Sequence, residues 1–277
     1  MKPTTEIEII EELIPEELSL GRKTIEKQLV YLMFERFRYE KEENTETART
    51  IISRNMLTEE RQSIDAKCTG IDHIIKDGKD VYVAAEVSKH QLKDFLATQK
   101  LEKQLKGALA YSLTEIVQEI HEHGIHNNNI AIERLSIYED GTLCMLSNYA
   151  SGTHEIKQVQ PSTQKTIPSE LIETLPKKRQ ALDTFKTAMA IHEIFTGEKI
   201  DMTTYSYKKD SKVPRNIFNT LRNVLDKERR AKYTRPHWLS RRIKEPDTNY
   251  LLKELKTYSH YCDELKEKMS EFCKSRN

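Results

Sequence analysis

Apolar and polar positions alternate in two stretches near the start of the chain. One is EIEIIEEL, residues 6–13, and the other is the longer, aromatic-rich EKQLVYLMFERFRYE, residues 26–40. Alternation of this kind, with branched and aromatic side chains, predicts strands. GIDHIIKDGKDVYVAAEV, residues 70–87, predicts two more strands around a turn at Asp77-Gly78. Between them, residues 45–64 place their apolar side chains on one helical face, so the first part is strands with one helix.

The pattern becomes mostly helical after residue 90. Residues 91–124 predict a short helix and then a long one that ends at Gly124. A hairpin follows over 134–150 with its turn at Asp140-Gly141, and the polar segment 151–165 is expected to be a loop. Two helices are expected in 183–197 and 215–230. The last thirty residues form an amphipathic pattern with these apolar positions: Leu251, Leu255, Tyr258, Cys262, Leu265, Met269 and Phe272.

Composition excludes several classes of protein. No apolar run approaches the roughly 20 residues of a membrane helix, and acidic residues in the first ten positions argue against a secretory signal. The four cysteines are far apart and form no CxxC pair, so neither a disulfide framework nor a zinc site is expected. The net charge of +1 gives no strong field for nucleic acid. A cytoplasmic protein without a transmembrane segment is expected, and the oligomeric state stays open.

The element order, and the stretch GIHNNNIAIERLSIYEDGTLCMLSNYASG at 124–152, resemble a protein kinase. In kinases a catalytic loop, a hairpin and a metal-binding motif follow one another in this way. The resemblance implies an α+β, two-lobed kinase-like fold over 1–245. Its strand-rich N-lobe would cover about 1–85 and its helical C-lobe about 91–245. An amphipathic C-terminal helix over 246–277 would follow.

The positions that carry kinase chemistry hold the wrong residues under this alignment. His126 keeps the histidine of the His-Arg-Asp motif, but Asn128 stands at the catalytic aspartate and Asn148 at the metal-binding aspartate. An amide cannot accept the substrate's proton, and loss of a general base typically slows a reaction by about 10²–10⁴. A neutral carbonyl is also a poor ligand for magnesium, which prefers carboxylates.

The nucleotide-binding parts are missing in the same way. The chain has no Gly-x-Gly-x-x-Gly loop, and YLMFE places Glu35 at the position of the kinase lysine. A carboxylate about 4 Å from a phosphate is repelled by about 4 kcal/mol at an effective dielectric near 20. The resemblance therefore implies an inactive kinase, not an enzyme, with no bound ATP or magnesium and no other cofactor.

Three positions that stabilise the kinase fold hold the residues that kinases have there, unlike the catalytic positions. In IPSEL, Glu170 corresponds to the glutamate of the Ala-Pro-Glu segment, and Asp183 stands near the start of the following helix. Arg230, in LDKERRAKYT, corresponds to the arginine that pairs with that glutamate in kinases. The resemblance implies structural roles for these three residues.

Four stretches resemble the narrower Scy-like family, also called N-terminal kinase-like proteins, which includes the yeast cytoplasmic tRNA export factor. They are ELIPEELSLGRK, YLMFE, IHNNN, and the segment from KVPRNIF to PHWL with the NYLLKEL that follows. The family's HEAT-repeat array has no counterpart in these 277 residues. The resemblance implies a non-enzymatic adaptor or scaffold in tRNA export or vesicle trafficking. Protein partners would bind the C-lobe or the C-terminal helix, and tRNA is a further candidate.

Two alternatives remain at this point. One is a divergent Ser/Thr kinase with residual ATP binding. The other is an RNA-binding module, because the segment 229–244 interleaves basic and aromatic side chains, a pattern that can hold phosphates and stack on bases. The candidate patch consists of Arg229, Lys232, Arg235, Trp238, Arg241 and Arg242.

Two smaller questions concern histidines and the C-terminal stripe. The spacing of His121, His123 and His126 does not suit metal ligands on a helix, so no metal site is expected. His121 and His123 are expected at the surface, and His126 inside the lobe. The apolar stripe of the last thirty residues suits either a partner or the chain's own lobe.

Overall fold

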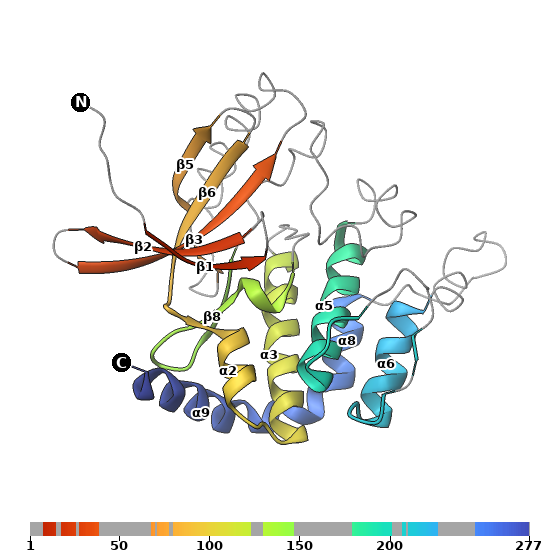
Figure 1. The fold of residues 1–277 in the computed structure, drawn as a ribbon. Helices are drawn as coiled ribbons and strands as arrows, with labels where there is room; N and C mark the ends of the chain where they lie inside the picture. The colour runs from red at the N-terminus through yellow and green to blue at the C-terminus, as the bar shows by residue number, and fades with distance from the viewer. Residues whose placement is uncertain are drawn as a thin grey trace, which may run out of the picture.

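The structure is a computed structural model, and its description covers eleven stretches of the chain. They are 8–14, 18–25, 28–38, 68–69, 71–77, 80–122, 130–146, 179–200, 207–208, 210–226 and 247–276. The helix expected over 45–64 and the loop expected over 151–165 lie outside the described residues. In the part described, the protein is a mixed α+β structure, with an antiparallel sheet at the N-terminal end and helices after it (Figure 1).

The N-terminal sheet has five antiparallel strands in the order β1-β2-β3-β6-β5. These are β1 (Glu8–Ile14), β2 (Leu18–Ile25), β3 (Gln28–Arg38), β5 (Ile71–Asp77) and β6 (Asp80–Val87). Alternation of apolar side chains explains why both faces are covered. Leu20, Met33 and Ala85 face each other across three strands in one buried cluster, whereas Phe34 and Ala84 belong to a second.

A smaller sheet lies between the large sheet and the helices, with the strand order β4-β9-β8-β7. Its strands are β4 (Cys68–Thr69), β7 (His90–Gln91), β8 (Leu135–Ile137) and β9 (Leu143–Leu146). The turn between β8 and β9 is the one that Asp140-Gly141 predicts. Gly141 has a φ of +83°, and the amide of Thr142 donates to the Asp140 carboxylate at 2.9 Å.

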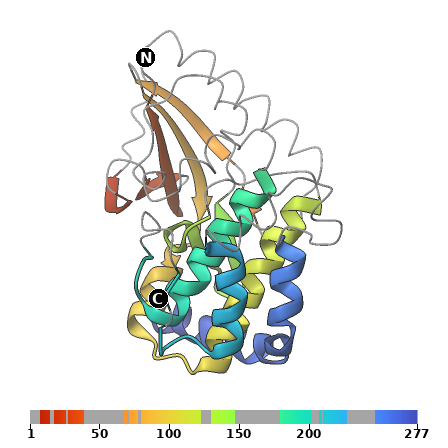
Figure 2. The same ribbon diagram turned by 90° about the vertical axis from the view of Figure 1, so that its right-hand side faces the viewer.

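The helical part is built around α3 (Lys103–Glu122), which carries buried side chains on several faces. The other described α-helices are α2 (Leu92–Thr98), α5 (Arg179–Thr196), α6 (Arg215–Leu225), α8 (Thr248–Leu255) and α9 (Cys262–Ser275). Two short 3₁₀ helices are η1 (Ile132–Arg134) and η5 (Lys256–Tyr261). One apolar cluster joins α3 with α2, η1 and α9, and another joins α5, α6 and α8. Figure 2 shows α3, α5, α6 and α8 side by side below the large sheet.

The C-terminal segment differs from the single helix expected over 246–277. It is divided into α8, η5 and α9, and the carboxylate of Asp247 caps the start of α8 by accepting from the amide of Tyr250. Its apolar stripe is turned inward, because Leu251, Leu255 and Leu265 are at most 1% exposed. The stripe therefore packs on the chain's own helices, which decides that alternative.

A membrane-crossing helix is absent from the described residues: none of their helices is both long and apolar enough to span a bilayer.

Candidate functional site

Most of the kinase-like positions lie outside the described residues. These are His126, Asn128, Asn148, Glu170 and Arg230, together with the whole basic patch of Arg229, Lys232, Arg235, Trp238, Arg241 and Arg242. The backbone of Glu35 is described. It lies in β3, the middle strand of the large sheet, paired with Leu18 of β2 and Val83 of β6.

Asp183 is fully buried near the start of α5. The ring Nε2 of His121, near the end of α3, lies 2.9 Å from its carboxylate, and the other ring nitrogen lies 3.3 Å from the hydroxyl of Thr248 in α8. These contacts join three helices. The expectation that His121 is a surface residue is wrong, because it is only 8% exposed. Thr114 and Val117 precede it by seven and four residues on the same buried face, and that spacing could have shown its position.

The described residues also form a hollow of about 480 Å³ that no sequence motif indicates. It lies between the end of α2, the start of α3, η1 and the end of α5. Its volume is within the range of small-molecule sites. The apolar lining is Leu96, Ala97, Leu101, Ile132 and Ile194, and the charged lining is Lys93, Lys100, Lys106 and Glu193.

Glu193 supplies a carboxyl group to the lining of the hollow, and the pKa of this group is strongly raised. Burial and the nearby Glu133 raise its pKa to about 7, and Lys199 opposes that shift. Lys199 pairs with the other carboxylate, that of Glu133. The second oxygen of Glu133 is buried and has no hydrogen-bond partner among the described residues. Glu193 is therefore partly protonated at neutral pH.

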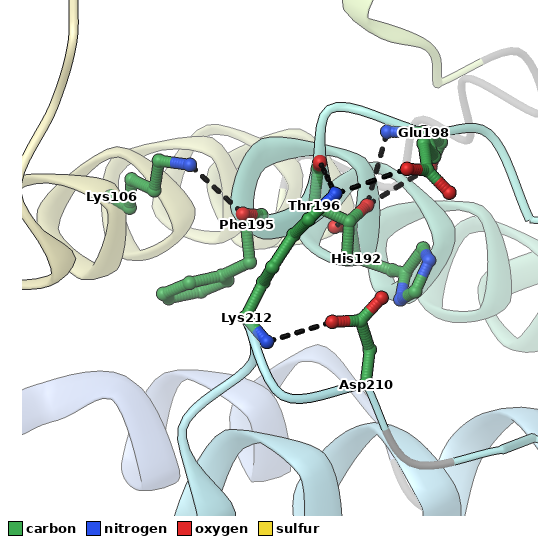
Figure 3. Close-up of polar contacts among 7 residues, drawn as sticks. All are labelled: Lys106, His192, Phe195, Thr196, Glu198, Asp210 and Lys212. Carbon is green, nitrogen blue, oxygen red and sulfur yellow. Dashed lines mark hydrogen bonds and ion pairs between the residues drawn. The ribbon is translucent and has the colours of Figure 1, made fainter.

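Two lysine side chains donate hydrogen bonds to the last carbonyls of α5, beside the hollow (Figure 3). Lys106 of α3 donates to the carbonyl of Phe195 at 2.9 Å, and Lys212 donates to the carbonyl of Thr196 at 3.0 Å. Cations at this end of a helix satisfy its last carbonyls and its dipole. Burial lowers the pKa of the Lys106 ammonium, and the charge of Lys212 lowers it further.

Further polar contacts join the C-terminal end of α5 to the residues that precede α6. His192 Nδ1 lies 3.0 Å from the hydroxyl of Tyr207, and Lys212 also bonds to the Glu198 carboxylate at 3.0 Å. Burial lowers the pKa of His192 and raises that of Tyr207, so both tend to be neutral. These neutral, mutually bonded groups serve the packing of the helices.

Metal and thiol chemistry have little support in this part of the chain. The described residues contain no group of three or more His, Cys, Asp or Glu side chains that could hold a metal ion. Burial raises the pKa of the Cys273 thiol to about 11 and also raises that of Cys262. Thiols with raised pKa values are poor nucleophiles.

Comparison of the chain with models of protein families found no match, and neither did comparison with curated proteins. Family membership therefore depends on the sequence motifs, and it enters below as a proposal.

Proposed function

We propose that this chain is a catalytically inactive, Scy-like pseudokinase that acts as a cytoplasmic adaptor in tRNA export or vesicle trafficking. The observation that carries the proposal is Glu35 in the middle strand of the N-terminal sheet, between β2 and β6. The resemblance puts the phosphate-binding lysine of a kinase in this strand. A carboxylate at that point repels a nucleotide.

The order of the described elements supports a two-lobed kinase-like fold. An antiparallel sheet comes first, and the short α2, the long α3, the β8–β9 hairpin and the helices α5 and α6 follow. This is the order that the resemblance implies for an N-lobe, a catalytic-loop region and a C-lobe.

The surroundings of Asp183 support a structural role for the helical part. Its carboxylate is buried against His121 of α3, and the third helix joined there, α8, comes from the C-terminal segment. An adaptor needs a rigid body to present partner-binding surfaces, and buried hydrogen-bonded groups of this kind contribute to one.

A phosphotransfer assay with radiolabelled ATP tests the absence of catalysis. We expect the intact chain to transfer no more phosphate, to itself or to a generic acceptor protein, than the variant Asn128→Ala. Activity that the wild type shows and Asn128→Ala loses would establish the divergent kinase instead.

Affinity capture from cytosol tests the adaptor role against RNA binding. We expect specific protein partners that survive treatment with RNase. If capture depends on RNA, falls steeply with salt and is lost in Arg241→Gln/Arg242→Gln, the RNA-binding alternative is correct. No reproducible partner under either condition would contradict the adaptor role.

A further inference from the structure

The hollow between α2, α3 and α5 combines apolar walls with cationic groups. Leu96, Leu101 and Ile194 supply apolar surface, and Lys100 and Lys106 line the same hollow. Lys93 contributes less charge, because it pairs with Glu11 of β1. This is the mixture of a mainly apolar wall and a few placed polar groups that small-molecule sites display.

Lys106 has donor capacity left for a ligand. An ammonium carries three N–H donors, and among the described residues Phe195 accepts the one hydrogen bond seen for this side chain. The adjacent charge of Lys212 already opposes the Lys106 ammonium, and an anion placed here would relieve that repulsion. Lys100 has no ion-pair partner in the described part of the chain.

Most of the groups that would repel an anion are paired, apart from the second carboxylate oxygen of Glu133 and the carboxyl group of Glu193. Carbonyl oxygens at the end of α5 accept from Lys106 and Lys212, and Lys199 pairs with the Glu133 carboxylate. Glu193 is the remaining acid on the lining, and its pKa near 7 leaves it partly protonated at neutral pH. When protonated, its O–H can donate to an anionic group instead of repelling it.

We propose that this hollow binds a small amphipathic anion, an aromatic or aliphatic acid. Its apolar body contacts Leu96, Leu101 and Ile194, and Lys100 and Lys106 hold its charged group. The site is separate from the nucleotide-binding strand of the proposed pseudokinase, so it does not depend on that function. Its volume of about 480 Å³ suits a molecule the size of a naphthalene ring with one acidic group.

Three probes of one shape test the charge preference by calorimetry and by saturation-transfer NMR. They are 2-naphthoate, 2-naphthalenemethanol and 2-naphthylmethylammonium, which are anionic, neutral and cationic. We expect 2-naphthoate to bind with a Kd of about 1 mM or tighter and the ammonium probe to bind most weakly. Tighter binding of the ammonium probe, or no binding of 2-naphthoate, would overturn the proposal.

Variants locate the binding. Lys100→Gln and Lys106→Gln should each weaken 2-naphthoate about three- to fivefold and leave the alcohol unchanged. Lys106→Arg keeps the charge and should keep the affinity, which separates loss of binding from loss of folding. Lys103→Gln is the matched control, because Lys103 is exposed in the same turn of α3 and does not line the hollow. Equal effects of Lys100→Gln and Lys103→Gln would contradict the assigned site.

The pH dependence of 2-naphthoate affinity is an independent test of the site. Ionised Glu193 repels the probe, so the affinity of the wild type for 2-naphthoate should fall between pH 6 and pH 8. Glu193→Gln should bind at pH 8 as tightly as the wild type binds at pH 6. A pH dependence that survives in Glu193→Gln would show that Glu193 does not face the ligand.

Discussion

At the scale of single residues, Asp183 connects parts of the chain that are far apart in sequence. Its partner His121 lies 62 positions earlier, and the hydroxyl on the other side of that imidazole belongs to Thr248. Both side chains of the pair are almost fully buried. A hydrogen bond to a charged group in such a place contributes more to stability than a surface pair does.

We expect Asp183→Asn to lower the free energy of unfolding by about 2 kcal/mol, because an amide NH₂ replaces one of the buried carboxylate oxygens beside His121. Asp263→Asn makes the same chemical change at an exposed site in α9 and should cost less than about 0.5 kcal/mol. Urea unfolding of both variants measures the difference. Equal free energies of unfolding for the two variants would mean that the buried contact between Asp183 and His121 does not stabilise the protein.

Glu193 gives the stability a defined pH dependence. Its pKa is about 7 in the folded protein and near 4.5 when exposed, so the folded state holds an extra proton between these values. Stability from this group is therefore present below about pH 4.5 and is lost as the pH rises to about 7. Glu193→Gln should remove about 1–2 kcal/mol of that loss, because the site is partly exposed.

Urea unfolding at pH 5 and pH 8 measures the effect of Glu193. The wild type should lose more stability than Glu193→Gln over this interval. Identical losses would show that the carboxyl group has an ordinary pKa.

The sequence indicates the burial of His121 but not the position of the hollow. The amphipathic spacing of α3 contains the signal for a buried His121, although no motif draws attention to it. The hollow could not be found in this way. Lys106 and the Phe195 carbonyl are 89 positions apart, and only the packing of α3 against α5 brings them together.

At the scale of elements, the hydrophobic pattern predicts β1, β3, β5, β6, α2, α3, α5, α6 and the β8–β9 hairpin. Alternation predicts no separate strand for β2, because Gly21 and the charged Arg22 and Lys23 interrupt its apolar positions after Leu20. Pairing with β1 and β3 supplies the hydrogen bonds that make it a strand. Tertiary contacts also explain why the C-terminal segment is divided into α8, η5 and α9. There η5 packs closely against α3, at a point where α3 has a glycine.

That point is Gly107, where an added Cβ would lie 2.2 Å from the ring of Tyr258. Gly107→Ala should destabilise the protein by about 1 kcal/mol or more, although alanine normally favours a helix by about that amount. In a Tyr258→Ala background the same change should become neutral or stabilising. Thermal and urea unfolding of the four proteins gives the coupling, and an alanine that stabilises the protein with Tyr258 present would refute this packing.

At the scale of the whole molecule, the C-terminal segment completes the helical core. Leu251 and Leu255 join the cluster of α5 and α6, whereas Leu265, Met269 and Phe272 join that of α2 and α3. Since the apolar stripe is used internally, a protein partner of this segment would have to bind its exposed, mostly charged side. Partner contacts at the C-lobe remain a prediction.

A calorimetric titration of the protein with magnesium-ATP tests most directly the proposal that it does not use ATP. We expect no binding heat and no rise in Tm at millimolar nucleotide, because the kinase resemblance puts Glu35 at the position of the phosphate-binding lysine and Asn148 at that of the magnesium ligand. Magnesium-dependent binding that raises the Tm of the wild type would contradict this account. It would favour the divergent kinase.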